Sequence, residues 1–396
     1  QLLNRFRLPT TVSVIEGAIG ATGMKPADAA ALEKLAQATF RLPFVEIASH
    51  SYSHPFYWDK AESWKPADGK AAHLAIPGYR FDLQRDVVGS VDYINTRLAP
   101  PGKKVKVFLW TGDCLPSEKA VLLTKSAGLY NLNGGGATQT VDRPSLTQLH
   151  PMMLPFDNGA LQVYAPIQND NVYTNHWTGP YHGFRRVIET MRLTESPRRL
   201  TPIAIYYHYF SGTKPAGIKA LADVYEWALT QEPHPLHASQ YVARVEAFAK
   251  ASISRRLDGT WELAGLGPGR TLRVDPALGY PDLRRSKGVA GVRDTAVGRF
   301  VTTTADRVEL ALTPAPPAEP FIERSNGEVV SFRAETPGRA RLRIRGHVPL
   351  VFGVGGARRA CVLTTSKGAV TGVARGSATV FTLPGSDTGE ATLACR

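Results

Sequence analysis

Hydrophobic positions along the first 250 residues alternate between two spacings. Apolar residues recur at helical spacing in stretches such as 32–40, and such a stretch is followed by a short apolar run, such as 44–48, that is typical of a buried strand. Proline and glycine at the edges of these stretches mark where helices begin and end. The pattern predicts helices over 32–40, 87–94, 116–128, 184–191, 216–230 and 239–250, and strands over 44–48, 105–110, 161–164 and 203–207.

Repeated alternation of strand and helix favours a parallel sheet, because parallel strands need a crossover connection between them. The sheet is either closed into a barrel or doubly wound, and the pattern alone does not choose between these. In both architectures, functional sites collect at the carboxyl ends of the strands. Residues that directly follow a predicted strand are therefore the candidates for chemistry.

The pattern changes after Ser252 to short alternating runs with many glycines and prolines. In 341–345, Leu342 and Ile344 alternate with three arginines, so period-two geometry places apolar side chains on one face and arginines on the other. Such alternation predicts an antiparallel β-sandwich, with a Pro/Ala-rich loop over 313–320 inside it. We therefore expect an α/β domain over 1–252 and a β-sandwich domain over 253–396.

The composition is that of a folded protein with a large core. The chain has 396 residues, of which 43% are hydrophobic and 20% charged. No stretch approaches the roughly 18 uninterrupted apolar residues of a membrane-spanning helix. No membrane span is therefore expected.

A formal charge of +13 suggests a polyanionic partner, but its distribution argues against nucleic acid. Residues 1–254 hold 26 Lys and Arg against 21 Asp and Glu, while residues 255–396 hold 21 against 13. The basic excess is densest in the β region, where arginines alternate as on a solvated sheet face, without interleaved aromatics to stack bases. Nine of the ten histidines lie before residue 255. Histidine chemistry is therefore expected in the first domain, and no nucleic-acid partner is expected.

Two histidines stand four residues apart, directly after the predicted strand 44–48. His50 and His54 can turn both imidazoles toward one point, as a zinc ion with two nitrogen ligands requires. The spacing alone is a weak signal, and its position after a buried strand strengthens it. The alternative is a pair of hydrogen-bonded structural histidines.

Two further polar residues end predicted strands. His208 follows the run 203–207, where it can protonate a departing amine; the alternative is a histidine packed in a cluster of aromatic residues. Asp113, a second catalytic candidate, follows 105–110 and can orient a histidine, accept a hydrogen bond from substrate or join a metal shell. Capping of the helix that starts near Pro116 explains Asp113 equally well.

Aromatic and amide side chains near these positions are candidates for binding a sugar, because ring faces pack on sugar rings while polar edges reach hydroxyl groups. The loop 175–182 carries two aromatics and two histidines, and a buried anchor is the equal alternative there for Trp177. The glycine-rich strand exit 131–136 lets a ligand approach the backbone, although a plain turn explains it better. The substrate-binding candidates are Trp58, Trp110, Asn133, His176, Trp177 and Tyr207.

Cysteine is scarce. Cys361 and Cys395 both fall in the β region and can form a disulfide, which requires an oxidising compartment. Cys114 is then unpaired and suits a small buried residue. The sequence contains no C-x-x-C pair, P-loop or dinucleotide fingerprint, so no nucleotide cofactor is expected.

The segment 46–55, Glu-Ile-Ala-Ser-His-Ser-Tyr-Ser-His-Pro, resembles the metal-binding histidine motif of the polysaccharide deacetylases, the NodB-homology carbohydrate esterases. The segment 206–208, Tyr-Tyr-His, resembles their Leu-x-His motif, which carries the general acid. The resemblance covers about residues 1–250 and, more faintly, the β domain. The stretches 8–20, 110–116, 171–183 and 197–212 look more specifically like the deacetylase region of the PelA family, periplasmic proteins that modify the Pel exopolysaccharide.

This resemblance implies a distorted (β/α) barrel that carries a metal-dependent polysaccharide N-deacetylase. The implied substrate is an exopolysaccharide of N-acetylhexosamine, rich in N-acetylgalactosamine, that is modified during biofilm matrix formation. The resemblance implies a divalent metal, Zn²⁺ above all, with His50 and His54 as metal ligands and His208 as the general acid. It also implies a periplasmic or secreted location and contact with other exopolysaccharide export proteins.

The chain also departs from the pattern of this family. The family's aspartate motif, which supplies the base and the third metal ligand, precedes the histidine pair, and no acidic residue before His50 lies in such a motif. We expect the chain to begin downstream of that motif, without the first barrel strand. The segment 110–116 replaces the arginine motif, and Tyr206 replaces the leucine of Leu-x-His.

Two alternative functions follow from these departures. The first is a non-catalytic polysaccharide-binding or scaffold module on a deacetylase fold, which the absent aspartate motif allows. The second is a glycoside hydrolase on a related barrel, which needs a pair of carboxylates at strand ends. Only Asp113 clearly qualifies for such a pair.

Overall fold

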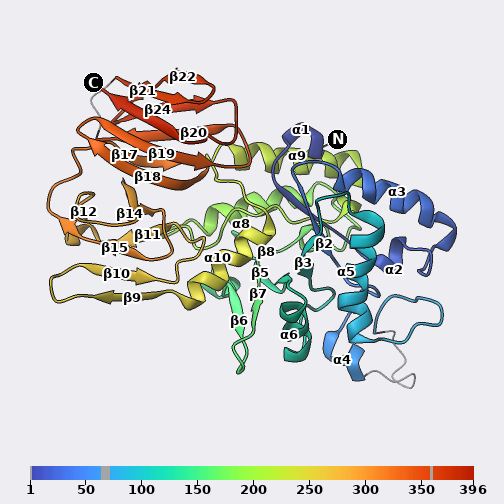
Figure 1. Cartoon of the computed structure of the whole chain (residues 1–396). Coiled ribbons are helices and arrows are strands. Elements are labelled where there is room, and N and C mark those ends of the chain that lie inside the picture. Colours follow the sequence, from blue (N-terminus) through green and yellow to red (C-terminus); the bar gives the residue numbers. More distant parts are fainter. Residues whose placement is uncertain (1, 64–71, 357–359) are drawn as a thin grey trace. The chain divides into compact units, whose positions relative to one another are not determined.

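The computed structural model describes residues 2–63, 72–356 and 360–396 (Figure 1). The chain divides into two units, one of Gln1–Thr230 and His237–Val245, the other of Gln231–Leu236 and Glu246–Arg396. The first unit contains a parallel sheet with helices, and the second is built from antiparallel strands.

The first unit is organised around a four-stranded parallel sheet in the order β1-β2-β3-β4. Its central strand β2 is buried along its whole length, as expected for a parallel strand that is covered on both faces. The pairings that the structure describes do not include closure into a barrel, which stays a prediction. The strands are β1 (Thr10–Val14), β2 (Val45–Ser49), β3 (Val105–Leu109) and β4 (Tyr130–Leu132), with a separate parallel pair of β5 (Gly135–Ala137) and β8 (Ala165–Ile167) and an antiparallel pair of β6 (Met153–Pro155) and β7 (Leu161–Val163).

The helices of the first unit begin and end where the sequence provides the signals. In α6, the Ser117 side chain accepts a hydrogen bond from Ala120 N at the first turn, and Gly128 takes a positive φ of 70° just beyond the last turn. The helices are α1 (Leu2–Phe6), α2 (Glu16–Ile19), α3 (Ala29–Phe40), α4 (Trp58–Ser63), α5 (Ser90–Tyr93), α6 (Glu118–Ser126), α7 (Asp170–Tyr173), α8 (Val187–Leu193), α9 (Pro215–Leu229) and α10 (Ala238–Lys250), of which the residues from Glu246 onward are assigned to the second unit.

Shorter helical turns complete this unit. Two π-helical turns, η3 (Arg85–Gly89) and η4 (Ile94–Leu98), flank α5, so that a continuous helical segment runs over 85–98 and buries Val87 and Val91. The 3₁₀ turns are η1 (Pro26–Asp28), η5 (Leu146–Gln148), η6 (Gly183–Arg186) and η7 (Tyr209–Thr213).

Two segments differ from the predicted elements. Residues Thr10–Val14 form strand β1, although their Thr-Thr-Val-Ser-Val alternation is too short to stand out from a loop. The apolar run 203–207, predicted as a strand, pairs with no strand in the part of the chain that the structure describes. Its half-buried side chains instead pack beside Phe184 and Leu221, because an apolar run can line a core without joining a sheet.

The second unit contains two groups of antiparallel strands, each with its own core. The first group packs around Val301 and Val308. Its sheets are β15 (Val308–Leu310), β10 (Trp261–Ala264) and β9 (Ser252–Arg255); β11 (Thr271–Val274), β14 (Gly298–Thr303) and β13 (Val289–Thr295); and β12 (Tyr280–Pro281) with β16 (Leu312–Thr313), while η8 (Pro276–Leu278) forms a 3₁₀ turn.

The second group is the β-sandwich, which follows the predicted loop over 313–320 (Figure 1). Phe352 and Phe381 from one sheet and Leu342 and Ile344 from the other share its core. Leu342 and Ile344 are fully buried while the arginines of the same strand are exposed or half-buried, so the predicted alternation is confirmed. One sheet has the order β17 (Phe321–Ser325), β20 (Leu350–Gly355), β24 (Ala378–Leu383), β23 (Val373–Arg375); the other has β18 (Glu328–Thr336), β19 (Arg339–Arg345), β25 (Ala391–Cys395), β21 (Cys361–Thr365), β22 (Gly368–Thr371).

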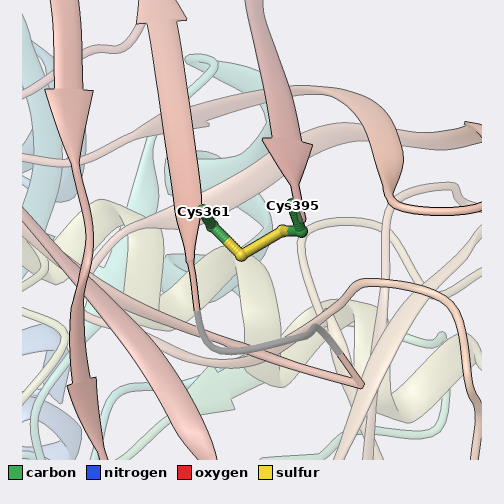
Figure 2. Close-up of a disulfide and its surroundings, with 2 residues drawn as sticks. All are labelled: Cys361 and Cys395. Atoms are coloured by element: carbon green, nitrogen blue, oxygen red, sulfur yellow. A yellow bond between two sulfur atoms is a disulfide. The ribbon is translucent and has the colours of Figure 1, made fainter.

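A disulfide joins neighbouring strands of this sandwich. Cys361 and Cys395 face each other in the register of β21 and β25, and their sulfur atoms are bonded (Figure 2). The pairing that the sequence permits is therefore present, and it is consistent with an oxidising compartment. Cys114 is a free cysteine. Among the described helices, none combines the length and the apolar character needed to cross a membrane.

Candidate functional site

His50 and His54 lie on the loop that directly follows strand β2, at the carboxyl end of the parallel sheet. Within this loop Ser51 and His54 have positive φ angles of 66° and 51°, which few residues other than glycine adopt. His54 N donates to the Ser51 hydroxyl at 2.8 Å, so the loop supports its own unusual turn. Backbone strain of this kind clusters at functional sites.

The buried carboxylate of Asp86 anchors this loop to the helical segment 85–98. Asp86 Oδ1 accepts hydrogen bonds from Ser53 N at 2.8 Å and from the Ser53 hydroxyl at 2.9 Å, and Oδ2 accepts one from the Tyr79 hydroxyl. The Asp86 carbonyl oxygen accepts a further bond from Tyr52 N at 3.2 Å. Burial raises the pKa of the Asp86 carboxyl, and the hydrogen bonds from Tyr79 and Ser53 oppose that rise.

The start of helix α2, just after strand β1, holds the loop from the other side. Glu16 N donates to Ser51 O, and Gly17 N donates to Tyr52 O. The Glu16 side chain is buried and binds Arg85 through both oxygens, with the guanidinium 3.8 Å above the Tyr52 ring. Burial raises the pKa of Glu16, and the hydrogen bond from Arg85 opposes this. Glu16, the acidic residue that follows β1, is therefore engaged in an ion pair.

The two imidazoles of the motif meet edge to face, with ring centroids 5.1 Å apart. His50 Nδ1 donates to the Leu109 carbonyl oxygen at 2.9 Å, which leaves Nε2 as the nitrogen with a free lone pair. His54 Nδ1 is buried and has no hydrogen-bond partner in the described structure. Burial lowers the pKa of His50 well below its usual range and that of His54 to about 4, and a charge on His208 would lower both further.

These features fit a metal site in part. Neutral imidazoles are the form that binds zinc, and a ligating histidine commonly donates its other ring nitrogen to a backbone carbonyl, as His50 does. The orphaned Nδ1 of His54 has the lone pair that a cation would use. In the described ranges, no group of three His, Cys, Asp or Glu side chains is arranged to hold a metal ion. The histidine pair would therefore supply two of the ligands that a zinc site requires.

His208 forms a dyad with Asp170, a residue that the sequence patterns did not single out. Asp170 is fully buried at the first turn of α7, and its Oδ1 accepts from His208 Nδ1 at 2.8 Å and from His208 N at 3.1 Å. Its Oδ2 accepts from the Ser211 hydroxyl and from Trp177 Nε1 at 3.0 Å. Burial opposes ionisation, but these hydrogen bonds and the charge of His208 prevail and lower the pKa of Asp170.

The loop that carries His176 and Trp177 is strained but well supported. Three successive residues, Asn175, His176 and Trp177, have positive φ angles of 47°, 52° and 62°. The Trp177 indole is tied to Asp170 and contacts the His208 ring at a centroid distance of 4.9 Å, while His176 is exposed. The structure therefore places Trp177 beside the candidate acid, with part of its ring accessible.

Tyr206 and Tyr207 point in opposite directions, because residues alternate along an extended segment. Tyr206 stacks on His208 at 6.0 Å between ring centroids, and its hydroxyl accepts from Asn133 Nδ2 at 2.9 Å. Tyr207 instead contacts Phe184 and lies with its hydroxyl 3.4 Å from that of Tyr225. The residue of this pair that faces the candidate site is therefore Tyr206, and not the Tyr207 that we expected to bind substrate.

Asp113 lies in the turn that follows β3. Its Oδ1 accepts hydrogen bonds from Leu115 N at 3.1 Å and from Trp58 N at 3.3 Å. Burial raises the pKa of Asp113, and these backbone donors oppose the rise. The helix cap that follows is Ser117, so Asp113 stabilises the turn ahead of α6. No contact of Asp113 with an imidazole is present among the described hydrogen bonds.

Three expected substrate-binding residues belong to the interior. Trp58 and Trp110 are both 0% exposed and pack edge to face, with their indole nitrogens bonded to Thr111 O and Asn131 Oδ1. Asn133 is buried, and its amide donates to Trp110 O as well as to Tyr206. These tryptophans have no ring face left for a sugar, because the sheet and its helices need large side chains to fill the space between them. We no longer retain them as binding residues.

Sequence reasoning missed Asp170 and Asp86, and only one of them had a usable signal. Asp170 is the third residue after strand β8, within the polar run Gln168-Asn169-Asp170-Asn171, and His50 likewise lies just beyond the end of a strand, directly after β2. Asp86 lies on an amphipathic helical segment, where a charged residue ordinarily faces solvent. Only the three-dimensional structure shows that Asp86 is buried against the histidine loop.

Comparison with known proteins adds no family to this description. No protein-family model, curated protein or solved structure matches the chain. The resemblance to polysaccharide deacetylases therefore rests on the sequence itself, on the motifs around His50, His54 and His208 and on the stretches named with them.

Proposed function

We propose that this chain is the metal-dependent N-deacetylase of an N-acetylhexosamine exopolysaccharide of the Pel type, rich in N-acetylgalactosamine and modified during biofilm matrix formation. The observation that carries the proposal is the convergence of three histidines. His50 and His54 present neutral ring nitrogens, one of them orphaned, within electrostatic range of His208, and Asp170 binds the Nδ1 of His208. Two ligating imidazoles beside a carboxylate-oriented histidine support amide hydrolysis better than a purely structural cluster.

The reaction requires that water adds to the acetamide carbon, that the carbon–nitrogen bond breaks, and that acetate and a free amine leave. A bound zinc ion would supply polarisation of the acetamide carbonyl. His208 donates a proton from Nε2 to the departing nitrogen, because Asp170 binds Nδ1 and so directs Nε2 away from itself. Trp177 packs against the same ring and limits its rotation. In the deacetylases that the chain resembles, an aspartate takes the proton from water, and no such motif precedes His50 in this sequence.

Metal content and acetate release test this function together. Zinc-loaded wild type should retain zinc and release acetate from an N-acetylgalactosamine polymer, and His50→Ala and His54→Ala should each lower acetate release by at least about 10²-fold. His150→Ala, which changes an exposed histidine, is the matched control and should behave as wild type. Unchanged zinc content and unchanged acetate release in both ligand variants would refute the proposal. Polymer binding without acetate release, insensitive to chelator, would indicate the non-catalytic module instead.

We also propose a periplasmic or secreted location, with exopolysaccharide export proteins as partners. The disulfide between Cys361 and Cys395 supports this location, because such bonds persist in oxidising compartments. Mass spectrometry of the protein from periplasmic and cytoplasmic fractions, after alkylation of free thiols, would test it. The expected result is a disulfide-bonded form in the periplasmic fraction, and a fully alkylated chain confined to the cytoplasm would contradict it.

A further inference from the structure

The turn that follows His208 buries its polar residue and exposes its aromatic ones. In η7, Ser211 is 7% exposed, whereas Tyr209 and Phe210 are 62% and 60% exposed. Large rings normally gain free energy by burial, and surface aromatics beside a candidate site are typical of binding surfaces. The arrangement is therefore the reverse of what folding alone favours.

The turn is too firmly held for these rings to fold inward. Ser211 N donates to His208 O at 3.1 Å, and the Ser211 hydroxyl donates to the buried Asp170. The Thr213 hydroxyl donates to Phe210 O at 2.7 Å. Helix α9 packs closely beneath, since a Cβ atom on Gly217 would lie 2.2 Å from Ser211 O. The backbone thus fixes both rings at the surface.

One of the exposed rings, Phe210, is continuous with the candidate site. The Phe210 ring lies 5.0 Å from Trp177, which in turn lies 4.9 Å from His208. Trp177 cannot swing away, because its indole nitrogen is bonded to Asp170 at 3.0 Å. A row of rings therefore leads from the imidazole that would protonate the leaving amine out to the surface.

We propose that Tyr209 and Phe210 form an aromatic platform on which the sugar rings next to the reacting residue of the polymer stack. This inference rests on the proposed function and names how its substrate is held. A polymer must leave the reacting centre over neighbouring surface, and a sugar ring presents C–H bonds to a ring face while its hydroxyls stay in water. Polar groups also border the turn. Lys214 directly follows η7, and its ammonium lies 5.4 Å from the centroid of the Tyr181 ring.

The test is the dependence of affinity on the length of the oligosaccharide, measured by calorimetry on the full chain. The probes are the monomer and the pentamer of N-acetylgalactosamine and of N-acetylglucosamine. Tyr209→Ala and Phe210→Ala should each weaken pentamer binding about 3- to 10-fold and so lower the ratio of pentamer to monomer affinity. Phe210→Tyr keeps an aromatic ring and should have the affinity ratio of wild type. Phe248→Ala, which removes a ring that is 65% exposed on α10, is the control and should leave the ratio unchanged.

The outcomes separate this inference from the proposed function. The platform would be overturned if both alanine variants bound the pentamer as wild type does. It would also be overturned if the variants lost equal affinity for monomer and pentamer, or if wild type bound no oligomer. If this surface instead binds a partner protein, pentamer affinity should be unchanged in both alanine variants. A length-dependent loss of affinity in the alanine variants, together with a wild type that releases no acetate, would support the platform and refute the deacetylase. Acetate release by wild type, with unchanged pentamer binding in the variants, would do the reverse.

Discussion

Replacement of Asp170 by asparagine removes the charge that holds His208 and leaves the size of the side chain unchanged. The carboxylate accepts hydrogen bonds from four donors, which are His208 N, His208 Nδ1, Trp177 Nε1 and the Ser211 hydroxyl. An amide has one oxygen and one NH₂ group. With the oxygen toward His208, the NH₂ group faces the Trp177 N–H, so two donors meet and the indole loses its acceptor.

The expected cost follows from these contacts. Asp170→Asn leaves a half-buried indole N–H unpaired and removes the charge from two bonds to His208, so the free energy of unfolding should fall by about 3 kcal/mol. Acetate release should fall by about 10²-fold through kcat, because a neutral amide binds the His208 imidazole more weakly than a carboxylate does and holds its orientation less firmly. The effect on KM should be small, since Asp170 is fully buried and does not touch substrate.

Urea unfolding followed by tryptophan fluorescence measures the first effect, and steady-state acetate release measures the second. Asp142→Asn serves as the control, because Asp142 forms an exposed ion pair with Arg186 and should change stability by less than about 0.5 kcal/mol. An Asp170→Asn protein with the unfolding free energy of wild type would refute the account of the dyad. If Asp142→Asn has normal stability and Asp170→Asn has the kcat of wild type, Asp170 does not position His208.

Three further predictions concern the histidine loop and the sandwich. Burial lowers the pKa of His54 to about 4, so at this residue the unfolded chain binds more protons than the folded chain between pH 6.5 and 4. In metal-free protein His54 should therefore lower the free energy of unfolding by about 3 kcal/mol as pH drops through this window, in addition to the contribution of His50. His54→Gln should remove the His54 part and so make the pH dependence shallower in urea titrations. Asp86→Ala removes the acceptor for Ser53 and should weaken zinc binding about tenfold in competition with a chelator. Cys395→Ser opens a crosslink between residues 34 positions apart and should lower the free energy of unfolding by about 3 kcal/mol, a loss that dithiothreitol should reproduce in wild type.

Each of these has a result that would count against it. The His54 prediction fails if wild type and His54→Gln share one pH profile. The Asp86 prediction fails if Asp86→Ala binds zinc as wild type does while its urea midpoint is lower, because the loop would then not need this anchor. Equal urea midpoints for oxidised wild type and Cys395→Ser would show that the disulfide constrains the unfolded chain little.

The spacing of hydrophobic residues was enough to predict an element where the pattern is long and places apolar residues on one face only. Helix α9 buries a continuous stripe that includes Leu221 and Val224, and strand β19 alternates over seven residues, so each pattern allows a single interpretation. The run 203–207 shows the limit, because apolar residues that line a core resemble a strand whether or not a neighbour is available for hydrogen bonding.

The candidate site was predictable where a motif follows a buried strand, as at His50 and His54. Tryptophan was harder to assign, since the same residue type fills cores and binds sugars. Trp58 fills the core and Trp177 remains partly accessible, and nothing in their immediate sequence separates the two. Asp170 and Asp86 act through contacts with residues 38 and 33 positions away, which no local pattern reveals.

Strand β25 is the latest in sequence of its five-stranded sheet, yet it lies between β19 and β21. Until residues 391–395 have been synthesised, the two halves of that sheet have no strand to join them. The sheet therefore cannot close until this strand is available, however early its other strands have folded. The disulfide between Cys361 and Cys395 then holds this late strand to its neighbour β21.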